Sequence, residues 1–420
     1  MRRVITMFSL IFAGEAIFTL PFHITRYFRP TYVDVLGVTQ TQIGILGSTY
    51  GVVAMVSYLF GGVLADRFSA RKLLAFSLVI TGATGFYVAT IPSFAALQVV
   101  YGFWGASTIL PFWASLIRAT RDWGGESQQG RAFGILDGGR GLLAAVLATV
   151  VFVFFAMILP ADDAVTTPDQ KLIAIRTTIY IYTGSCFAAA VLVWLFVPET
   201  TAQRKTKESN KRGVLTNLTK VLRMPVIWLH AGVIVAAYSA FKGMDFYGQF
   251  TSDVWNWSDV SSARLTTMST WIRPLAAIGA GFLADRFTSS RMITVSFVLA
   301  GVVYIGFVVM EPGTGAVVWL LWANILVGCL GIFALRGVYF ALLEEARIPR
   351  EFTGTAVGVV SFIGYTPEIF IPIVGGKLID HWQSGPMGYN VLFGIFAVCA
   401  LLGIVANGWM SFFYIESEPS

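Results

Sequence analysis

Charged and polar side chains recur at helical spacing inside two long apolar segments of the chain. The first segment contains a set spaced 4, 4 and 3 residues apart, Glu15, Thr19, His23 and Arg26. The second contains a set spaced 4, 3 and 4 residues apart, Tyr238, Lys242, Asp245 and Gln249. Residues three or four apart lie on one face of an α-helix, so each set predicts a polar stripe. If these segments lie in a bilayer, each charge costs about 3 kcal/mol or more, and such charges usually mark a substrate or ion pathway.

Other apolar segments contain further residues that can bind or exchange charge. These are Tyr50, Trp113, Asp137, Arg140, Arg273, Arg336, Tyr365 and Glu368. Cationic side chains outnumber carboxylates in the whole set, and arginine binds phosphate, sulfonate or carboxylate through two parallel hydrogen bonds. We therefore predict a small organic anion as the ligand. The predicted binding residues are His23, Arg26, Arg140, Lys242, Asp245, Arg273 and Tyr365.

The same charges also allow a purely structural interpretation. Asp137 with Arg140, and Lys242 with Asp245, are three residues apart and can form ion pairs within one helix. Glu15 and Glu368 have no cation three or four residues away, so each either pairs with another helix or exchanges a proton. We take Glu15, Asp137 and Glu368 as candidates for proton coupling.

The composition indicates which environment these segments occupy. Hydrophobic residues make up 56% of the chain, charged residues only 12%, and the mean hydropathy is +0.72. Soluble domains are about one quarter charged, so most of this surface must lie in lipid. Segments of about 20 apolar residues predict about twelve membrane helices. They lie near 4–28, 42–64, 73–91, 94–117, 132–158, 174–197, 225–250, 265–284, 292–310, 316–343, 353–379 and 387–413.

Basic residues gather in alternate loops, which predicts the topology. The positive-inside rule assigns these loops, and therefore both termini, to the cytoplasm. We read the net charge of +6 as this topology signal and not as affinity for nucleic acid. One long basic segment, 199–223, interrupts the apolar pattern in the middle of the chain. It predicts an N-terminal six-helix bundle over 1–198, a cytoplasmic linker, and a C-terminal six-helix bundle over 224–420.

The two halves share a short motif. Residues 61–68, which read GGVLADRF, return as AGFLADRF at 280–287, so 219 residues separate Asp66 from Asp285. Internal duplication of this kind is common in transporters. A carboxylate at the cytoplasmic end of a helix can pair with loop arginines and cap a neighbouring helix, so the motif can act as a latch. The alternative is a topology determinant without a gating role.

These residues resemble the major facilitator superfamily, whose signature between helices 2 and 3 is Gly-x-x-x-Asp-Arg/Lys-x-Gly-x-Arg/Lys. The first copy matches at Gly62, Asp66, Arg67 and Arg71, with Ser69 in place of the second glycine. The second copy keeps Gly281, Asp285, Arg286 and Arg291. The resemblance implies an all-α membrane protein with two pseudo-symmetric six-helix bundles, and these eight residues as its gating motif.

A narrower resemblance concerns Gly354-Thr355-Ala356-Val357-Gly358 and Gly364-Tyr365. They are similar to the organophosphate:phosphate antiporter branch, to which the glycerol-3-phosphate transporter belongs. That branch grips phosphate with facing cations on helices 1 and 7. The position 43 residues before each motif aspartate is His23 and Lys242 here. This resemblance implies that inorganic phosphate is a candidate coupling ion, beside the proton.

The expected function is therefore secondary active transport of a small organic anion such as a sugar phosphate, sulfonated sugar or sugar acid. The two polar stripes would face a shared cavity, which opens to either side in turn. A proton-coupled transporter of neutral or amphiphilic compounds is the alternative. An ATP-driven pump is disfavoured because the phosphate-binding loop motif is missing, and an enzyme because the three histidines do not cluster. We expect a monomer in the bacterial inner membrane, with no metal, cofactor or nucleic-acid partner.

Overall fold

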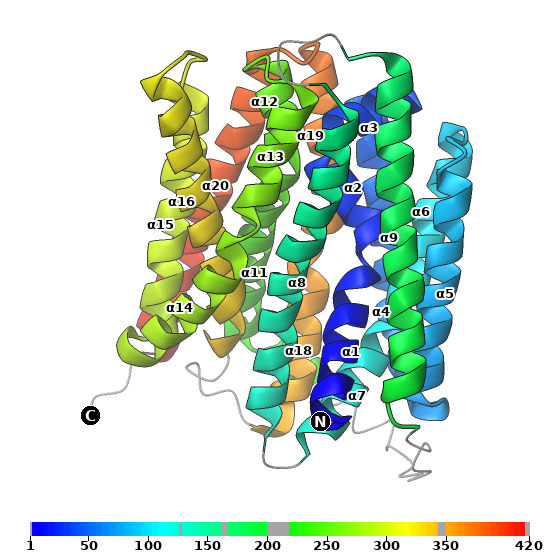
Figure 1. The fold of residues 1–420 in the computed structure, drawn as a ribbon. Helices are drawn as coiled ribbons and strands as arrows, with labels where there is room; N and C mark the ends of the chain where they lie inside the picture. The colour runs from blue at the N-terminus through cyan, green and yellow to red at the C-terminus, as the bar shows by residue number, and fades with distance from the viewer. Residues whose placement is uncertain (1, 126–127, 161–165, 200–217, 343–349, 416–420) are drawn as a thin grey trace. The chain divides into compact units, whose positions relative to one another are not determined.

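The computed structural model describes residues 2–125, 128–160, 166–199, 218–342 and 350–415, and within these ranges it contains helices and no β-strand (Figure 1). Most of the predicted linker therefore lies outside the described residues. The side chains of Asp66 and Asp285, and the burial of Gly281, lie outside the described part as well.

The first half of the chain forms nine α-helices within the described residues, with one π-helical turn at Thr19–His23. They are α1 (Arg2–Ala16), α2 (Ile24–Tyr27), α3 (Arg29–Leu36), α4 (Gln40–Arg67), α5 (Ala70–Val88), α6 (Phe94–Ile109), α7 (Trp113–Gly124), α8 (Gln129–Ile158) and α9 (Pro168–Phe196). Two of the helix starts show a clear local cause. Thr39 before α4 and Thr167 before α9 each form a capping box with the glutamine three residues later.

The second half is more often interrupted. Its helices are α11 (Pro225–Gly243), α12 (Tyr247–Asp253), α13 (Asp259–Ser269), α14 (Ile272–Phe287), α15 (Ser289–Val309), α16 (Ala316–Val338), α18 (Arg350–Gly364), α19 (Pro367–His381) and α20 (Pro386–Met410). Short 3₁₀ turns at Met244–Phe246 and Tyr339–Ala341 follow α11 and α16, and a π-helical turn at Ser411–Ile415 follows α20.

Ten helical stretches in the described part of the chain are long and apolar enough to cross a membrane. They confirm that the chain is a multi-pass membrane protein. The predicted segments 73–91 and 265–284 are not among the ten. The first corresponds to α5, whose first turn contains Arg71 and Lys72, and the second is divided between α13 and α14 by a turn at Thr270–Trp271.

Tertiary contacts group the helices into two compact units. Unit 1 consists of Met1–Gln203, Asp245–Trp271 and Pro372–His381, and unit 2 of Arg204–Met244, Ile272–Ile371 and Trp382–Ser420. The segments 245–271 and 372–381 of the second half thus group with the first half. Two of the changes between units fall where helices are interrupted, in the 3₁₀ turn after α11 and in the turn between α13 and α14, and a third falls at Pro372 inside α19. Proline removes a backbone donor and weakens a helix at that point.

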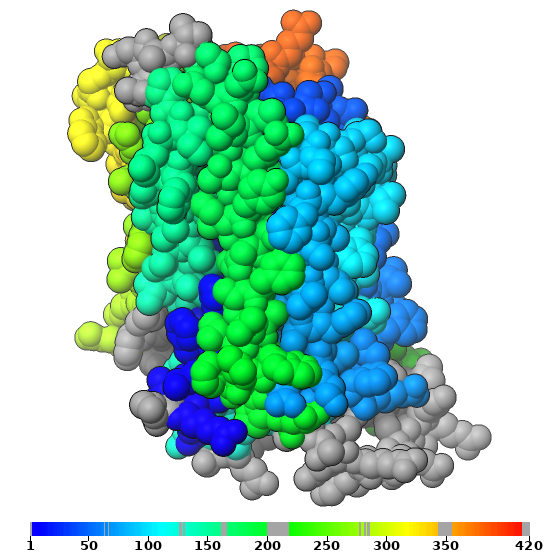
Figure 2. Space-filling view, turned by 45° about the vertical axis from the view of Figure 1, so that its right-hand side comes forward, coloured from blue at the N-terminus to red at the C-terminus, as the bar shows by residue number. Residues whose placement is uncertain are grey.

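Unit 1 has two apolar cores. One is built around Trp104, Tyr182 and Phe155, the other around Phe112, Leu116 and residues of α1. Helices α4 and α6, α5 and α9, and α1 with both α8 and α9 pack as pairs. Figure 2 shows α8, α9 and α5 side by side on one face of this unit. That face has exposed large apolar side chains, including Phe86, Tyr180, Val191, Trp194 and Leu195. Such a surface suits lipid, where no water has to be displaced from it.

Two glycines allow α4 and α19 to approach closely within unit 1. A Cβ atom on Gly44 would collide with the backbone of Pro372, and one on Gly376 would collide with the backbone of Gln40. Small residues at such crossings let helix backbones pack directly, which drives association in lipid. Helix α19 is therefore fixed to the start of α4 by backbone contact.

Unit 2 packs α20 against α15 and α11, α16 against α15 and α14, and α18 against α11. An aromatic cluster of Tyr304, Phe307, Phe393 and Phe396 fills the space between α15 and α20. The Tyr304 hydroxyl donates to the carbonyl of Ala240, one turn before the end of α11. This contact occupies the place where a side chain on Gly243 would lie.

Candidate functional site

The first helix is broken at the position where its polar stripe lies. α1 ends at Ala16, and a π-helical turn containing Pro21 spans Thr19–His23. π-Turns inside helices are often found at functional positions. The break brings the His23 ring to Glu15, with Nε2 and Oε1 3.2 Å apart, although eight residues of straight helix would rise about 12 Å. The stripe is therefore a local contact network and not a row of parallel side chains.

Arg140 of α8 completes this network, which we call the Glu15 cluster (Glu15, His23 and Arg140). Its Nε atom donates to the Gly14 carbonyl at 2.9 Å and lies 3.5 Å from Glu15 Oε2. The guanidinium stacks over the rings of Phe18 and Trp113, 5.7 and 5.5 Å from their centroids. The Glu15 and His23 side chains are 4% exposed, so the carboxylate is buried between a histidine and an arginine.

The second stripe divides between the two units. Asp245 accepts a hydrogen bond from Arg26 Nε at 2.6 Å within unit 1. Lys242, three residues earlier, pairs with Glu368 in unit 2. A 3₁₀ turn begins at Met244, between the two residues, so the regular α-helix ends before Asp245.

Lys242 forms the centre of the Glu368 cluster (Tyr238, Lys242 and Glu368) in unit 2. Its Nζ atom lies 3.0 Å from Glu368 Oε1, and the Tyr238 hydroxyl donates to Oε2 at 2.6 Å. The Lys242 and Glu368 side chains are 5% and 10% exposed. Glu368 lies in the first turn of α19, immediately after the break at Tyr365–Thr366. Two interrupted helices thus bring a buried lysine and a buried carboxylate together.

Aromatic side chains surround the Glu368 cluster. The Arg336 guanidinium lies 4.0 Å from the centroid of the Phe241 ring and 5.9 Å from that of Tyr238. The Tyr365 ring packs against that of Tyr238 at an angle of 57°, with ring centroids 5.0 Å apart, and its hydroxyl lies 3.3 Å from that of Tyr339. The structure therefore places the predicted residues Tyr365 and Arg336 beside Lys242 and Glu368.

Of the four other predicted residues, Asp137 and Trp113 contact Arg140 of the Glu15 cluster. Asp137 is 67% exposed, and its Oδ1 atom lies 3.8 Å from Arg140 Nη1. Trp113 lies under the Arg140 guanidinium, and its role as lining of a substrate cavity stays a prediction. Tyr50 instead hydrogen-bonds to Thr108 at 2.8 Å between α4 and α6. Arg273 is half-buried in the first turn of α14.

The motif loops contain a different kind of contact. Arg71 and Lys72 at the start of α5 pair with Glu199, with Lys72 Nζ 2.7 Å from Oε1. Hydrogen bonding from Lys72, with the charge of Arg71 beside it, holds the pKa of Glu199 below its ordinary value. Of the other predicted motif residues, Gly62, Arg67, Arg286 and Arg291 are exposed at helix ends. The latch formed by Asp66 and Asp285 falls on side chains outside the described part of the chain, so it stays a prediction.

Unit 1 also contains an ion cluster that the sequence analysis did not predict. Lys171 at the start of α9 lies 2.5 Å from Asp34 Oδ2 and 3.0 Å from Asp259 Oδ2. Asp259 is the first residue of α13, so the cluster joins the second half of the sequence to the first. The sequence signal for this cluster is that its charged residues stand at helix ends, in loops that contain few other charges. Their pairing required the tertiary structure.

Asp380 makes a second such connection. Its carboxylate accepts from the backbone N–H groups of Gln40 and Thr41, at 3.1 and 2.7 Å, in the first turn of α4. A carboxylate at this position satisfies helix donors that lack internal partners and complements the helix dipole. Together with the close approach of Gly44 and Gly376, this fixes the end of α19 on α4.

Comparisons with known proteins agree with this arrangement of helices. The model of the Major Facilitator Superfamily matches residues 4–372. The inner membrane protein YqcE of Escherichia coli (strain K12) is 28% identical over 391 residues, which cover 91% of this chain and 88% of YqcE.

A functionally named relative and a solved structure extend the comparison. The hexuronate transporter of Bacillus subtilis (strain 168) is 23% identical over 395 residues, covering 90% of this chain and 88% of that protein. The crystal structure of the nucleoside transporter NupG aligns with a TM-score of 0.71 at 14% identity, over 97% of this chain and 98% of NupG. At that identity the second likeness concerns the fold alone. On the family match, which extends over most of its length, the chain belongs to the Major Facilitator Superfamily of multi-pass membrane transporters.

Proposed function

We propose that this protein is a secondary active transporter of a small organic anion, such as a sugar acid, sugar phosphate or sulfonated sugar. The observation that most supports the proposal is that each unit buries a carboxylate together with cationic side chains inside membrane-spanning helices. Buried ions of this kind are expensive and are rarely kept for structure alone. The candidate ligands for the anion are His23 and Arg140 in unit 1, with Lys242 and Arg336 in unit 2.

The cations of the two clusters favour an anion over a neutral compound. In the Glu15 cluster, Arg140 lies beside Glu15, and His23 adds a positive charge whenever it is protonated. In the Glu368 cluster Lys242 pairs with Glu368, and Arg336 lies over the rings of Phe241 and Tyr238. An incoming anion can therefore replace a carboxylate as the partner of a cation, and this exchange links binding to the state of the protein. The hexuronate named for the Bacillus subtilis relative is a carboxylate, which agrees with this chemistry.

Glu15 and Glu368 are the proposed proton carriers, because each accepts hydrogen bonds or ion pairs that a proton would release. Protonation of Glu15 would free Arg140 and His23 for the substrate, and protonation of Glu368 would free Lys242. Asp137 is a weaker candidate because its side chain is mostly exposed. Exchange against inorganic phosphate is the other coupling mode, and it requires no carboxylate to titrate.

Flux into liposomes tests the proposal directly. Purified protein would be reconstituted and assayed with a panel of hexuronates, sugar phosphates and sulfonated sugars, beside neutral sugars and nucleosides. Each compound would be tested with a pH gradient, with internal phosphate, and with neither. Saturable uptake of an anion that a gradient or phosphate accelerates would support the proposal. Uptake of neutral compounds alone would favour the proton-coupled alternative and contradict the anion.

The orientation in the membrane is part of the same proposal. We place both termini and the 199–223 linker in the cytoplasm of a bacterial cell, with the protein in the inner membrane. A cysteine introduced by Ser209→Cys tests this with a membrane-impermeant thiol reagent. We expect labelling only after the cells are opened. Labelling of intact spheroplasts would show that residue 209 lies outside the cytoplasm and would contradict this topology.

A further inference from the structure

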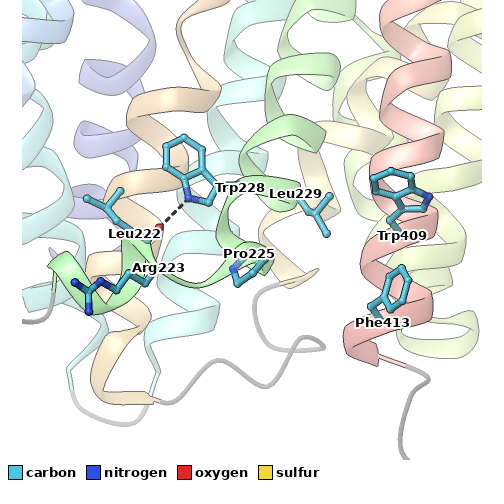
Figure 3. A pocket seen from close by; sticks show the side chains of 7 residues that line it. All are labelled: Leu222, Arg223, Pro225, Trp228, Leu229, Trp409 and Phe413. Atoms are coloured by element: carbon cyan, nitrogen blue, oxygen red, sulfur yellow. Dashed lines mark hydrogen bonds between the residues drawn. The ribbon is translucent and has the colours of Figure 1, made fainter.

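A groove lies at one end of unit 2, where α11 begins and α20 ends. It has a volume of about 550 Å³ and is lined by Leu222, Arg223, Pro225, Trp228, Leu229, Trp409 and Phe413 (Figure 3). This volume falls within the range of sites for small ligands. The groove shares no residue with the Glu15 or Glu368 clusters, so its occupant is independent of the transported substrate.

The groove has the side chains of a membrane–water interface. Trp228 and Trp409 are 54% and 60% exposed, and Phe413 beside them is exposed as well. The Trp228 ring is held in place because its Nε1 atom donates to the Leu222 carbonyl at 2.9 Å. Exposed tryptophans at the ends of membrane helices lie at the level of the lipid headgroups. The groove therefore opens where headgroups meet the apolar core.

One end of the groove is positively charged. Figure 3 shows Arg223 at the opposite end from the rings of Trp409 and Phe413. Arg223 is exposed and stands two residues before Pro225, the first residue of α11. Its guanidinium and the N-terminal end of the α11 dipole both favour an anion, and none of the described residues that line the groove is acidic. An occupant with a phosphate at one end and an apolar body matches both ends.

An apolar stripe leads from the groove along α20. Val398, Leu402, Val405 and Trp409 are all exposed and are spaced 4, 3 and 4 residues apart. At this spacing they form one face of the helix, which ends at the groove. A stripe of this length offers an acyl chain a continuous path from the headgroup level into the apolar core of the bilayer.

We infer that this groove is a binding site for an anionic phospholipid. The lipid phosphate pairs with Arg223, the headgroup lies against Trp228 and Trp409, and one acyl chain follows the α20 stripe. Ordinary annular lipid would need neither the groove nor the arginine. The site therefore distinguishes phosphatidylglycerol, with its net negative charge, from zwitterionic phosphatidylcholine.

Native mass spectrometry of the full-length protein tests the inference. Protein released from detergent would be titrated with phosphatidylglycerol or with phosphatidylcholine, and bound lipids would be counted. We expect one phosphatidylglycerol to bind more tightly than the others, and Arg223→Ala to weaken it about fivefold. Arg223→Lys should retain most of the affinity. Arg131→Ala, which removes an exposed arginine near the start of α8, is the matched control and should bind as the wild type.

A second measurement locates the acyl chain. Phosphatidylglycerol brominated on its acyl chains quenches the fluorescence of a nearby tryptophan, and we expect Trp409→Phe to remove part of that quenching. The same loss with brominated phosphatidylcholine, at equal lipid concentration, would show that the groove is not selective. Equal binding of the two lipids by wild-type protein, or unchanged binding in Arg223→Ala, would overturn the inference.

Discussion

The Glu15 cluster and the Glu368 cluster each bury a carboxylate inside membrane helices, but they surround it with different residues. Glu15 meets an arginine from another helix and a histidine from its own broken helix. Glu368 meets a lysine and a tyrosine hydroxyl from α11, which is a separate helix. The first cluster depends on a π-turn, the second on the ends of two interrupted helices.

The difference lies in which partner can change its charge near neutral pH. Histidine is the side chain whose ordinary pKa places its charge change between pH 5 and 8. Lysine and tyrosine titrate far above that range in water. Of the two proposed proton carriers, Glu15 therefore has a partner, His23, of a type that can change its charge near neutral pH. Glu368 has a lysine and a tyrosine in the corresponding places.

The largest expected effect follows from removing one cation from either cluster. Arg140→Ala and Lys242→Ala should weaken binding of the transported anion by tens to thousands of fold, since losing one partner of a buried charge pair costs about 2–5 kcal/mol. Arg140→Lys should also weaken binding, because an ammonium cannot form the paired hydrogen bonds of a guanidinium. Isothermal titration with the substrate identified by flux measures this.

Lys377→Ala is the matched control for that experiment. Lys377 is an exposed cation on α19, the helix that contains Glu368. It should bind substrate as the wild type does. If both Arg140→Ala and Lys242→Ala bind the substrate as tightly as the wild type, the two clusters do not bind it. If the substrate proves to be neutral or cationic, the proposal of an anionic substrate is wrong.

Replacing each carboxylate separates the roles of the two clusters. Glu15→Gln should lose the acceleration of uptake by a pH gradient, because neither the carboxylate nor its coupling to His23 remains. Glu368→Gln should reduce the gradient dependence as well, and should also change substrate affinity because Lys242 loses its carboxylate partner. Uptake into liposomes, measured at a series of imposed pH gradients, distinguishes these results. Glu311→Gln, at an exposed loop position, serves as the control. If both variants keep the gradient dependence of the wild type, neither Glu15 nor Glu368 carries the proton.

The aromatic partners should have smaller effects. Phe241→Leu removes the ring 4.0 Å from Arg336, and Trp113→Leu removes a ring 5.5 Å from Arg140. A cation–π contact contributes about 0.5–2 kcal/mol, so we expect a loss of about 2- to 30-fold in substrate affinity. The effect should be larger at Phe241 because that contact is shorter. Phe86→Leu, on the exposed face of α5, provides a control, and a larger loss at Trp113 would reverse the order.

The smallest effect is expected at the exposed pairs of Glu199 with Arg71 and Lys72. Folding lowers the pKa of this carboxyl below its ordinary value of 4.5, chiefly through the hydrogen bond from Lys72. The resulting stabilisation is present above the ordinary pKa and is lost as the pH falls through the lowered value. Glu199→Gln should therefore slightly lower the Tm at pH 7, with a difference that shrinks toward pH 4. A difference that grows on acidification would contradict the assignment.

Much of the fold could be predicted from local sequence features. Apolar length, loop charge and the repeat of the motif around Asp66 and Asp285 predicted membrane helices and the transporter family, and both are confirmed. These signals are local or periodic, so they can be read from the sequence without knowledge of how the helices pack. The interruption of helices at Met244–Phe246 and Tyr365–Thr366 was not predicted, because each turn lies within one helical stretch that is long and apolar enough to cross a membrane.

The partners of the buried charges depended on the tertiary structure. Sequence spacing selected His23, Arg140, Lys242 and Glu368, and it offered Lys242 with Asp245 as a pair. The structure pairs Asp245 with Arg26 and Lys242 with Glu368, over separations of 219 and 126 residues. Spacing along one helix determines which side chains share a face, but a buried ion takes a partner that satisfies it at least cost in desolvation. These partners lie on other elements, α2 for Asp245 and α19 for Lys242, so only the tertiary structure decides them.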